Sequence, residues 1–124
     1  LRDQRTELCC AEERFVGDLR WTAEALGNVL KNCMEHSPTG GTITVSAAET
    51  ALYTAITVED EGQGFAPEEL PHLFERFYKG ENSAGYGIGL ALARTIITAQ
   101  NGTIRAMNTA KGAKFEIRFY KTVV

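Results

Sequence analysis

A glycine-rich turn that leads directly into a helical pattern constrains this chain more than any other stretch. The turn covers residues 85–90, with the sequence GYGIGL, and apolar residues then recur at helical spacing as far as Gln100. Glycines let a backbone approach a ligand closely, and the free N–H groups and dipole of a helix N-terminus favour negative charge. The stretch therefore predicts an anion cradle, although a turn of this composition can also be only a turn.

The composition is that of one ordinary globular domain. The chain has 124 residues, 44% hydrophobic and 23% charged, which is enough for a single core, so we predict one domain over residues 1–124. A net charge of −3 argues against nucleic acid as a partner. There is no apolar run of about 20 residues and no signal-peptide pattern. Because the first residue is Leu1 rather than Met, we expect a fragment of a longer parent protein.

Periodicity predicts an ordered series of elements. We expect a helix over residues 19–36, capped by Asp18, with its apolar face built from Thr22, Leu26, Val29, Leu30 and Cys33. Alternating segments predict two antiparallel hairpins, 42–48 with 52–59 and 103–108 with 113–120. A short helix from Pro67, a mobile loop over 79–84, a helix ending before Asn101-Gly102, and short strands at 7–11 and 15–16 complete the series. This order predicts helices on one face of a mostly antiparallel sheet.

Several polar motifs within these elements each fit two roles. Asn28 and Asn32 share one flank of the first helix, either as solvated residues or as amides near Mg²⁺, which prefers oxygen ligands. Asp60 opens the sequence DEGQG after a strand, either as a turn residue or as a carboxylate that accepts a hydrogen bond from an adenine amine. Phe74 and Phe77 fit a core or a binding site. Zinc is not expected, because His36 and His72 lie far apart without a Cys/His cluster.

The order of these motifs is more specific than any one of them. The helix with the sequence NVLKN, then DEGQG, LFERFYKG and GYGIGLALA, together resemble the catalytic ATP-binding domain of sensor histidine kinases. That family shares a superfamily with type II topoisomerase and Hsp90 ATPase domains. The resemblance covers residues 16–120. It implies an α/β two-layer sandwich of the Bergerat type, with about three helices on one face of a mixed, mostly antiparallel sheet.

The resemblance also implies which residues surround the nucleotide. Asn32 stands where the family binds Mg²⁺, and Asp60 stands where it binds the adenine amine. The glycines of residues 85–90 would hinge a lid and face the phosphates. The residues expected around Mg-ATP are Asn28, Asn32, Glu35, His36, Asp60, Gly62, Gly64, Phe65, Phe74, Arg76, Phe77, Lys79, Gly85, Tyr86, Gly87, Ile88, Gly89 and Leu90.

Three features depart from the family pattern. Glu35 occupies a position that commonly carries Lys, so either Lys79 or Arg76 replaces that phosphate contact or Glu35 points away. Ala113 follows Gly112 where the family often has Thr, which removes a hydroxyl from the site. The lid between Gly80 and Gly85 is short, which should limit how fully it covers the nucleotide.

The resemblance predicts a kinase rather than a hydrolase. Hydrolysing relatives carry Glu at the position of Asn28, and an amide cannot act as a general base. The phosphate acceptor would be a histidine on a dimerisation domain outside this chain, with a response regulator downstream, in a homodimeric parent; the fragment itself should be monomeric. We expect a cytoplasmic domain of a protein anchored in a bacterial cell membrane. The alternatives are an anti-sigma-factor-type serine kinase, a hydrolysing ATPase, and a degenerate interaction module that binds no nucleotide.

Overall fold

The computed structural model describes residues 5–9, 18–78 and 88–121, which contain one five-stranded sheet. The strand order is β1-β2-β3-β5-β4. The strands are β1 (Arg5–Cys9), β2 (Thr42–Glu49), β3 (Tyr53–Glu59), β4 (Gly102–Asn108) and β5 (Ala113–Tyr120). β1 pairs with β2 in parallel, and all other neighbours in this sheet are antiparallel. The prediction of a mixed, mostly antiparallel sheet is therefore confirmed.

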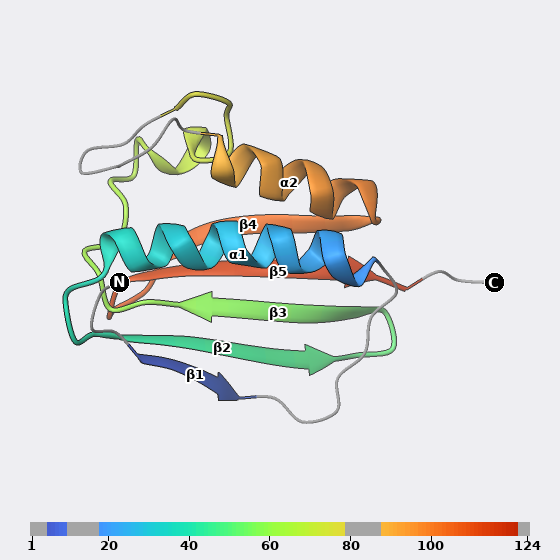
Figure 1. Cartoon of the computed structure of the whole chain (residues 1–124), viewed down its shortest axis with the longest axis horizontal. Coiled ribbons are helices and arrows are strands. Elements are labelled where there is room, and N and C mark those ends of the chain that lie inside the picture. Colours follow the sequence, from blue (N-terminus) through green and yellow to red (C-terminus); the bar gives the residue numbers. More distant parts are fainter. Residues whose placement is uncertain (1–4, 10–17, 79–87, 122–124) are drawn as a thin grey trace.

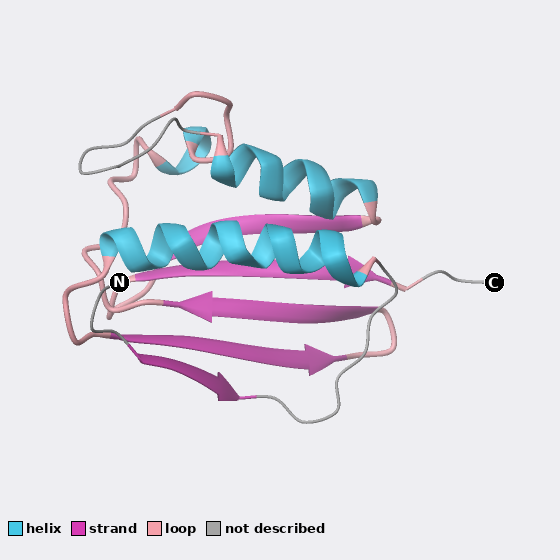
Figure 2. Cartoon of the chain, in the orientation of Figure 1, coloured by secondary structure: helices cyan, strands magenta, loops and turns pink. Residues whose placement is uncertain are grey.

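Two α-helices form the second layer of the domain. Helix α1 (Leu19–His36) and helix α2 (Gly89–Ala99) lie side by side on one face of the sheet (Figures 1 and 2). The third helical element of the described residues is a 3₁₀ helix, η1 (Leu70–His72). It is shorter than expected and starts after Pro67. The Glu69 N–H donates to the Ala66 carbonyl and the His72 N–H to the Glu69 carbonyl, so the chain forms successive tight turns instead of a longer helix. The two-layer α/β sandwich is confirmed.

Helix α1 begins where its sequence predicts. The Asp18 carboxylate accepts hydrogen bonds from the backbone N–H groups of Arg20 (2.9 Å) and Trp21 (3.2 Å), which have no partner within the helix. The Asp18 N–H donates in turn to Oε1 of Gln100, the residue after α2. The first cap of α1 therefore also joins the two helices.

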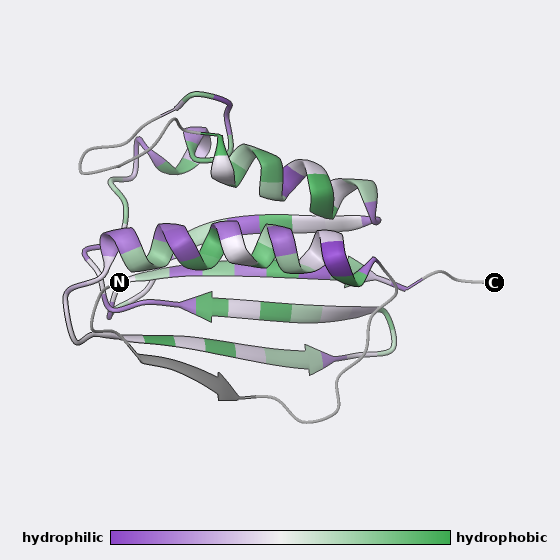
Figure 3. Cartoon of the chain, viewed as in Figure 1, coloured by the Kyte–Doolittle hydropathy of each residue, from purple (hydrophilic) through white to green (hydrophobic). Residues whose placement is uncertain are grey.

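The core lies between the helices and the inner face of the sheet. Apolar and polar residues alternate over the first part of β2 and the second part of β3, as Figure 3 shows, and every second residue of β3 is buried. On α1 the buried residues are Thr22, Ala25, Val29 and Cys33, while Leu26 and Leu30 pack only partly against the core. The apolar face is thus centred on Ala25 rather than on Leu26. The fully buried residues of the sheet and of α2 are Ile43, Val58, Phe115, Ile117, Ala93 and Ile97.

The strand boundaries differ from the predicted ones in four places, the smallest being that β2 ends at Glu49 rather than at residue 48. Leu52, expected in a strand, is 65% exposed, because Thr50 closes a turn by accepting from the N–H groups of Leu52 and Tyr53 at its hydroxyl. β4 begins at Gly102 rather than Thr103. The first strand covers Arg5–Cys9 instead of residues 7–11, of which 10 and 11 lie outside the described residues. The expected strand at 15–16 and loop at 79–84 also lie outside them.

Candidate functional site

Asp60 follows β3 directly and is 3% exposed. Its Oδ1 atom accepts hydrogen bonds from the N–H groups of Gly62 and Ala113, both at 3.0 Å. Its Oδ2 atom is also buried, and no described residue donates a hydrogen bond to it. A buried carboxylate oxygen without a donor is costly to fold, because it has lost water without replacing it. Oδ2 is therefore the atom of Asp60 that can accept a hydrogen bond from a ligand.

Two glycines let the chain pass closely around Asp60. A Cβ at Gly62 would collide with the carbonyl oxygen of His36, at the end of α1. A Cβ at Gly112 would collide with the Asp60 backbone and lie 2.8 Å from Asp60 Oδ1. Gly62, the first glycine of DEGQG, is thus required because α1 and the segment after β3 approach each other closely.

The segment after Asp60 is held by the β4–β5 hairpin at Phe65. The Asn108 side chain accepts from the Phe65 N–H at 2.8 Å and donates to the Phe65 carbonyl at 2.7 Å. Gly64, with a φ of 75°, adopts the left-handed conformation that brings Phe65 to this position. The Phe65 ring packs edge-on against the rings of His36 (5.8 Å between centroids) and Phe115 (6.0 Å).

The two asparagines of α1 supply further unpartnered atoms. Asn32 Oδ1 and Asn28 Nδ2 are buried, and neither has a hydrogen-bond partner among the described residues. Asn28 lies beside the start of α2: a Cβ built on Gly89 would be 3.9 Å from Asn28 Cγ. An amide oxygen without a donor suits a hard cation such as Mg²⁺, which commonly takes only one or two protein ligands. Asn32 therefore fits the predicted metal ligand.

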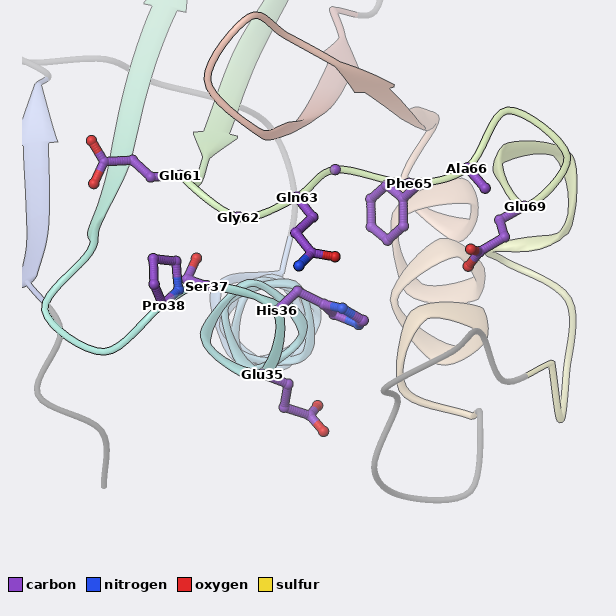
Figure 4. A pocket seen from close by; sticks show the side chains of 11 residues that line it. Glu35, His36, Ser37, Pro38, Glu61, Gly62, Gln63, Phe65, Ala66 and Glu69 are labelled. Carbon is purple, nitrogen blue, oxygen red and sulfur yellow. The ribbon is translucent and has the colours of Figure 1, made fainter.

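A pocket of about 610 Å³ opens between the end of α1 and the segment after Asp60 (Figure 4). A smaller cavity of about 30 Å³ adjoins it and reaches Leu90 in α2. Both are lined by His36 and Phe65, so they share one wall. Of the predicted residues, the larger pocket contacts Glu35, His36, Gly62, Gly64 and Phe65, and the smaller contacts Asn32, His36, Phe65 and Leu90.

The larger pocket is acidic. Three acidic residues, Glu35, Glu61 and Glu69, line it, and no lysine or arginine does so among the described residues. In Figure 4 the Glu35 carboxylate points away from Gln63 and the chain beside it. Of the two possibilities left open for Glu35, its orientation favours the second, in which the carboxylate points away.

Asp60 lines neither of these two cavities but a separate one of about 340 Å³, together with Thr44 and Lys111.

Three further predicted residues lie away from the acidic pocket. Phe74 packs on Phe115 at 6.3 Å between ring centroids, and with Arg76 it lines a separate groove of about 420 Å³ along α2. Phe77 is 67% exposed, and the Arg76 guanidinium lies 5.1 Å from the centre of its ring. The structure does not bring these three residues to the acidic pocket, and their role toward ATP stays a prediction.

The remaining predicted residues divide into two groups. Lys79, Gly85, Tyr86 and Gly87 lie outside the described residues. Ile88 is 45% exposed and precedes α2, whose first turn receives no side-chain cap from the described residues. Because the first N–H groups of a helix have no partner within the helix, those of α2 are available to a ligand.

Sequence reasoning missed three contributors to the site. Asn108 and the N–H of Ala113 lie on the β4–β5 hairpin, far in sequence from the residues they hold. The third is Cys33, fully buried beside Asp60, where burial first and the Asp60 charge second raise the pKa of its thiol. The sequence predicts the hairpin itself, but only Gly112 could have indicated that it approaches Asp60, since a glycine there permits the close contact.

Two features are absent from the described residues. These residues contain no group of three or more His, Cys, Asp or Glu side chains that could hold a metal ion. Among the helices they form, none is long and apolar enough to cross a bilayer.

Comparisons with known proteins identify the family. The family described as histidine kinase-, DNA gyrase B-, and HSP90-like ATPase matches residues 17–123. The sensor histidine kinase CusS of Escherichia coli (strain K12) is 39% identical over 118 residues, covering 86% of this chain and 25% of CusS. The sensor histidine kinase YvrG of Bacillus subtilis (strain 168) is 36% identical over 112 residues, covering 86% of this chain and 19% of YvrG.

A solved structure agrees with these sequence matches. The mycobacterial sensor histidine kinase MprB superposes with a TM-score of 0.87 at 26% identity, covering 95% of this chain and 84% of that chain. The chain spans about a quarter of the length of CusS and a fifth of YvrG. It therefore belongs to the histidine kinase-, DNA gyrase B-, and HSP90-like ATPase family, as an ATP-binding catalytic domain of the sensor histidine kinase type.

Proposed function

We propose that this domain binds Mg-ATP and donates its γ-phosphate to a histidine on a separate dimerisation domain of the same protein. A response regulator would then receive the phosphate. One observation carries the proposal beyond family membership. Three buried polar atoms on two elements, Asp60 Oδ2, Asn32 Oδ1 and Asn28 Nδ2, have no partner among the described residues. Their chemistry matches three different parts of one ligand, namely base, metal and phosphate.

Asp60 would select the base. Its Oδ1 is already occupied by two N–H donors, so the carboxylate is fixed and Oδ2 is the remaining acceptor. The exocyclic amine of adenine is a donor at the position where guanine carries a carbonyl oxygen. A charge-assisted hydrogen bond from that amine would satisfy Oδ2 and favour adenine over guanine.

The phosphates would lie toward α2. Asn32 would ligate Mg²⁺ through Oδ1, and Asn28 would donate to a phosphate oxygen through Nδ2. The uncapped first turn of α2 adds N–H groups and the positive end of a helix dipole beside Asn28. Bound Mg²⁺ would supply charge neutralisation between phosphate oxygens. This metal matters here because three acidic residues line the larger pocket.

The position of Asn28 supports phosphotransfer over hydrolysis. An amide has no basic lone pair that can take a proton from water, so the domain holds ATP without activating its hydrolysis. Catalysis then consists of positioning and charge neutralisation while an external histidine attacks. The homodimeric parent, its cytoplasmic orientation and its membrane anchor belong to the same proposal.

Calorimetry of the purified chain with ADP, in the presence and absence of Mg²⁺, tests nucleotide binding. We expect binding that Mg²⁺ strengthens, and a ligand at 100 times its Kd should add about 2.7 kcal/mol to the free energy of unfolding. Asn32→Ala should remove the strengthening by Mg²⁺ while leaving metal-free ADP binding within about twofold. No binding at millimolar ADP would contradict the proposal.

The acidic lining of the pocket favours one alternative, a module that binds partners without nucleotide. Phosphotransfer distinguishes the two. Radiolabelled ATP and this chain should label a dimerisation domain from the parent protein at its histidine, with acid-labile and alkali-stable label. A serine kinase would give acid-stable label, and a non-catalytic module would give none.

A further inference from the structure

Asn108 forms an unusual connection between the hairpin and the pocket. Its side chain pairs with Phe65, 43 residues away, through both the N–H (2.8 Å) and the C=O (2.7 Å) of the Phe65 backbone. This is the pattern of two bonds that a neighbouring strand would provide, made instead by one amide. Among the common side chains only an amide offers a donor and an acceptor side by side in this way.

The same hairpin holds the other end of this segment. Asn108 pairs in register with Ala113, whose carbonyl accepts from the Asp60 N–H and whose N–H donates to the Asp60 carboxylate. Residues 60–65 are thus fixed at both ends to the single Asn108–Ala113 rung that closes the β4–β5 hairpin. Between these two points the Gly62 N–H donates to Asp60 Oδ1, and the Glu61 carboxylate accepts from the Thr42 N–H of β2 at 2.8 Å.

The held segment forms a wall of the pocket. Gly62, Gln63 and Phe65 line it from the side opposite the end of α1 (Figure 4). The Phe65 ring contacts His36 across it and also lines the smaller cavity that reaches Leu90. A shift of Phe65 would therefore change both cavities at once.

Gly64 shows how closely the two parts fit. Its φ of 75° is in the left-handed region, and a Cβ there would lie 2.6 Å from Asn108 Oδ1. Any residue other than glycine at position 64 would therefore collide with the Asn108 side chain in its present position. The left-handed turn places the Phe65 N–H at Asn108, and the amide then keeps the turn in that conformation.

We infer that Asn108 is a positioning residue for the nucleotide: by holding the Phe65 backbone at its N–H and C=O, it keeps residues 60–65 as a preformed wall beside the base. The inference rests on the proposed function. Asn108 itself does not touch the ligand. Without it, hydrogen bonds would fix the segment only at its start, at Asp60 and Glu61, and binding would have to order the end that carries Phe65, which lowers affinity.

Three variants test this inference with ADP as the probe. Asn108→Ala removes both hydrogen bonds, and Asn108→Asp keeps the shape and the acceptor but loses the donor. Asn101→Asp is the matched control, because Asn101 also donates to a backbone carbonyl, that of Tyr120 at 3.4 Å, at the far end of β4. Both Asn→Asp changes add one negative charge, and both positions are exposed.

We expect Asn108→Ala and Asn108→Asp to weaken ADP binding by about tenfold, and Asn101→Asp to stay within about twofold of the original chain. Urea denaturation gives the folded fraction, and affinities are compared per folded molecule at a temperature where every variant is folded. Asn108→Asp, which conserves volume, serves if Asn108→Ala folds poorly. A purely structural role would lower stability and leave the affinity of the folded protein unchanged.

Other results would overturn the inference. Unchanged ADP affinity in folded Asn108→Ala would do so directly. Weakening by Asn108→Asp alone, and only at low salt, would show a long-range charge effect instead. Equal weakening by Asn101→Asp would show a general loss of sheet order. Failure of the original chain to bind ADP would contradict the proposed function, a result distinct from all of these.

Discussion

Asp60 and Ala113 hold each other through two hydrogen bonds in opposite directions. The Asp60 backbone N–H donates to the Ala113 carbonyl at 2.9 Å, and the Ala113 N–H donates to the Asp60 carboxylate at 3.0 Å. Residue 113 therefore serves the site through its backbone. This explains how Ala can stand where the family often has Thr without releasing Asp60.

Replacing Asp60 by Asn separates binding from folding. The new Oδ1 can still accept from Gly62 and Ala113, but Nδ2 then presents hydrogen atoms where Oδ2 had been an acceptor. We expect Asp60→Asn to weaken ADP binding by about a hundredfold and to change the free energy of unfolding by less than about 1 kcal/mol. Calorimetry and urea denaturation measure the two effects. Asn28→Ala should weaken ADP far less, and equal losses would contradict the base-reading role of Asp60.

A glutamate at position 28 should introduce hydrolysis. Asn28→Glu places a carboxylate beside the start of α2, where Gly89 lacks a side chain that could obstruct it. We expect the rate of phosphate release from ATP to rise by about tenfold or more, since general bases contribute at least that much. Asn28→Gln is the control, because it has the same length but no basic oxygen. Equal rates in the two variants would remove Asn28 as the reason for slow hydrolysis.

Reversing the charge at Glu35 should strengthen nucleotide binding. Glu35 is one of three acidic residues that line the pocket, and its carboxylate points away from Gln63, so Glu35→Lys removes a nearby negative charge and adds a flexible cation that can reach phosphate. We expect ADP affinity to rise by about threefold to tenfold at low salt and to approach the original value near 0.5 M salt. Glu24→Lys makes the same charge change on an exposed residue of α1, three turns earlier. A similar gain there would indicate net charge rather than position.

The buried thiol of Cys33 predicts a loss of stability at alkaline pH. Burial first, and the Asp60 charge second, raise the pKa of Cys33 in the folded chain above its ordinary value of 9.0. The thiol therefore stabilises the fold fully below pH 9, and this contribution is lost as the pH rises, because only the unfolded thiol ionises. Above pH 9 the free energy of unfolding should fall by up to about 1.4 kcal/mol per pH unit from this group.

Comparison with Cys33→Ala isolates that contribution. The variant loses packing at every pH, but it should lack the additional slope above pH 9. Urea denaturation at several pH values between 7 and 10 gives both curves, and the other cysteines are common to the two proteins. Parallel curves would mean that the Cys33 thiol ionises equally in the folded and unfolded chains.

The fold could be predicted where its signals are local. The cap at Asp18 and the limits of α1 agree with the sequence, because capping and helical periodicity act within one turn of the chain. The hairpin of β4 and β5 agrees for the same reason. The prediction that Leu52 belongs to a strand is wrong, because the Thr50 hydroxyl, rather than hydropathy, decides where the turn before β3 ends.

The site could be predicted only in part, because its contacts are not local. Asn32, Asp60 and Gly62 follow from motif order, and the structure brings α1 and the end of β3 together around them. Asn108 gives no such signal, since one asparagine at the end of a strand fits many roles until its partner 43 residues away is known. The parallel pairing of β1 with β2 is hidden for the same reason, because a strand pattern does not name its neighbour.

The place of β1 at the margin of the sheet has a consequence for handling this domain. β1 lies outside the family-matched residues 17–123, yet it covers the backbone of β2 from Thr42 to Ser46. A chain trimmed to the matched residues would leave those N–H and C=O groups unpaired on a strand that carries Ile43 and Val45. Such an open edge is a template for pairing with other molecules. The short first strand thus protects the domain against self-association as well as completing its sheet.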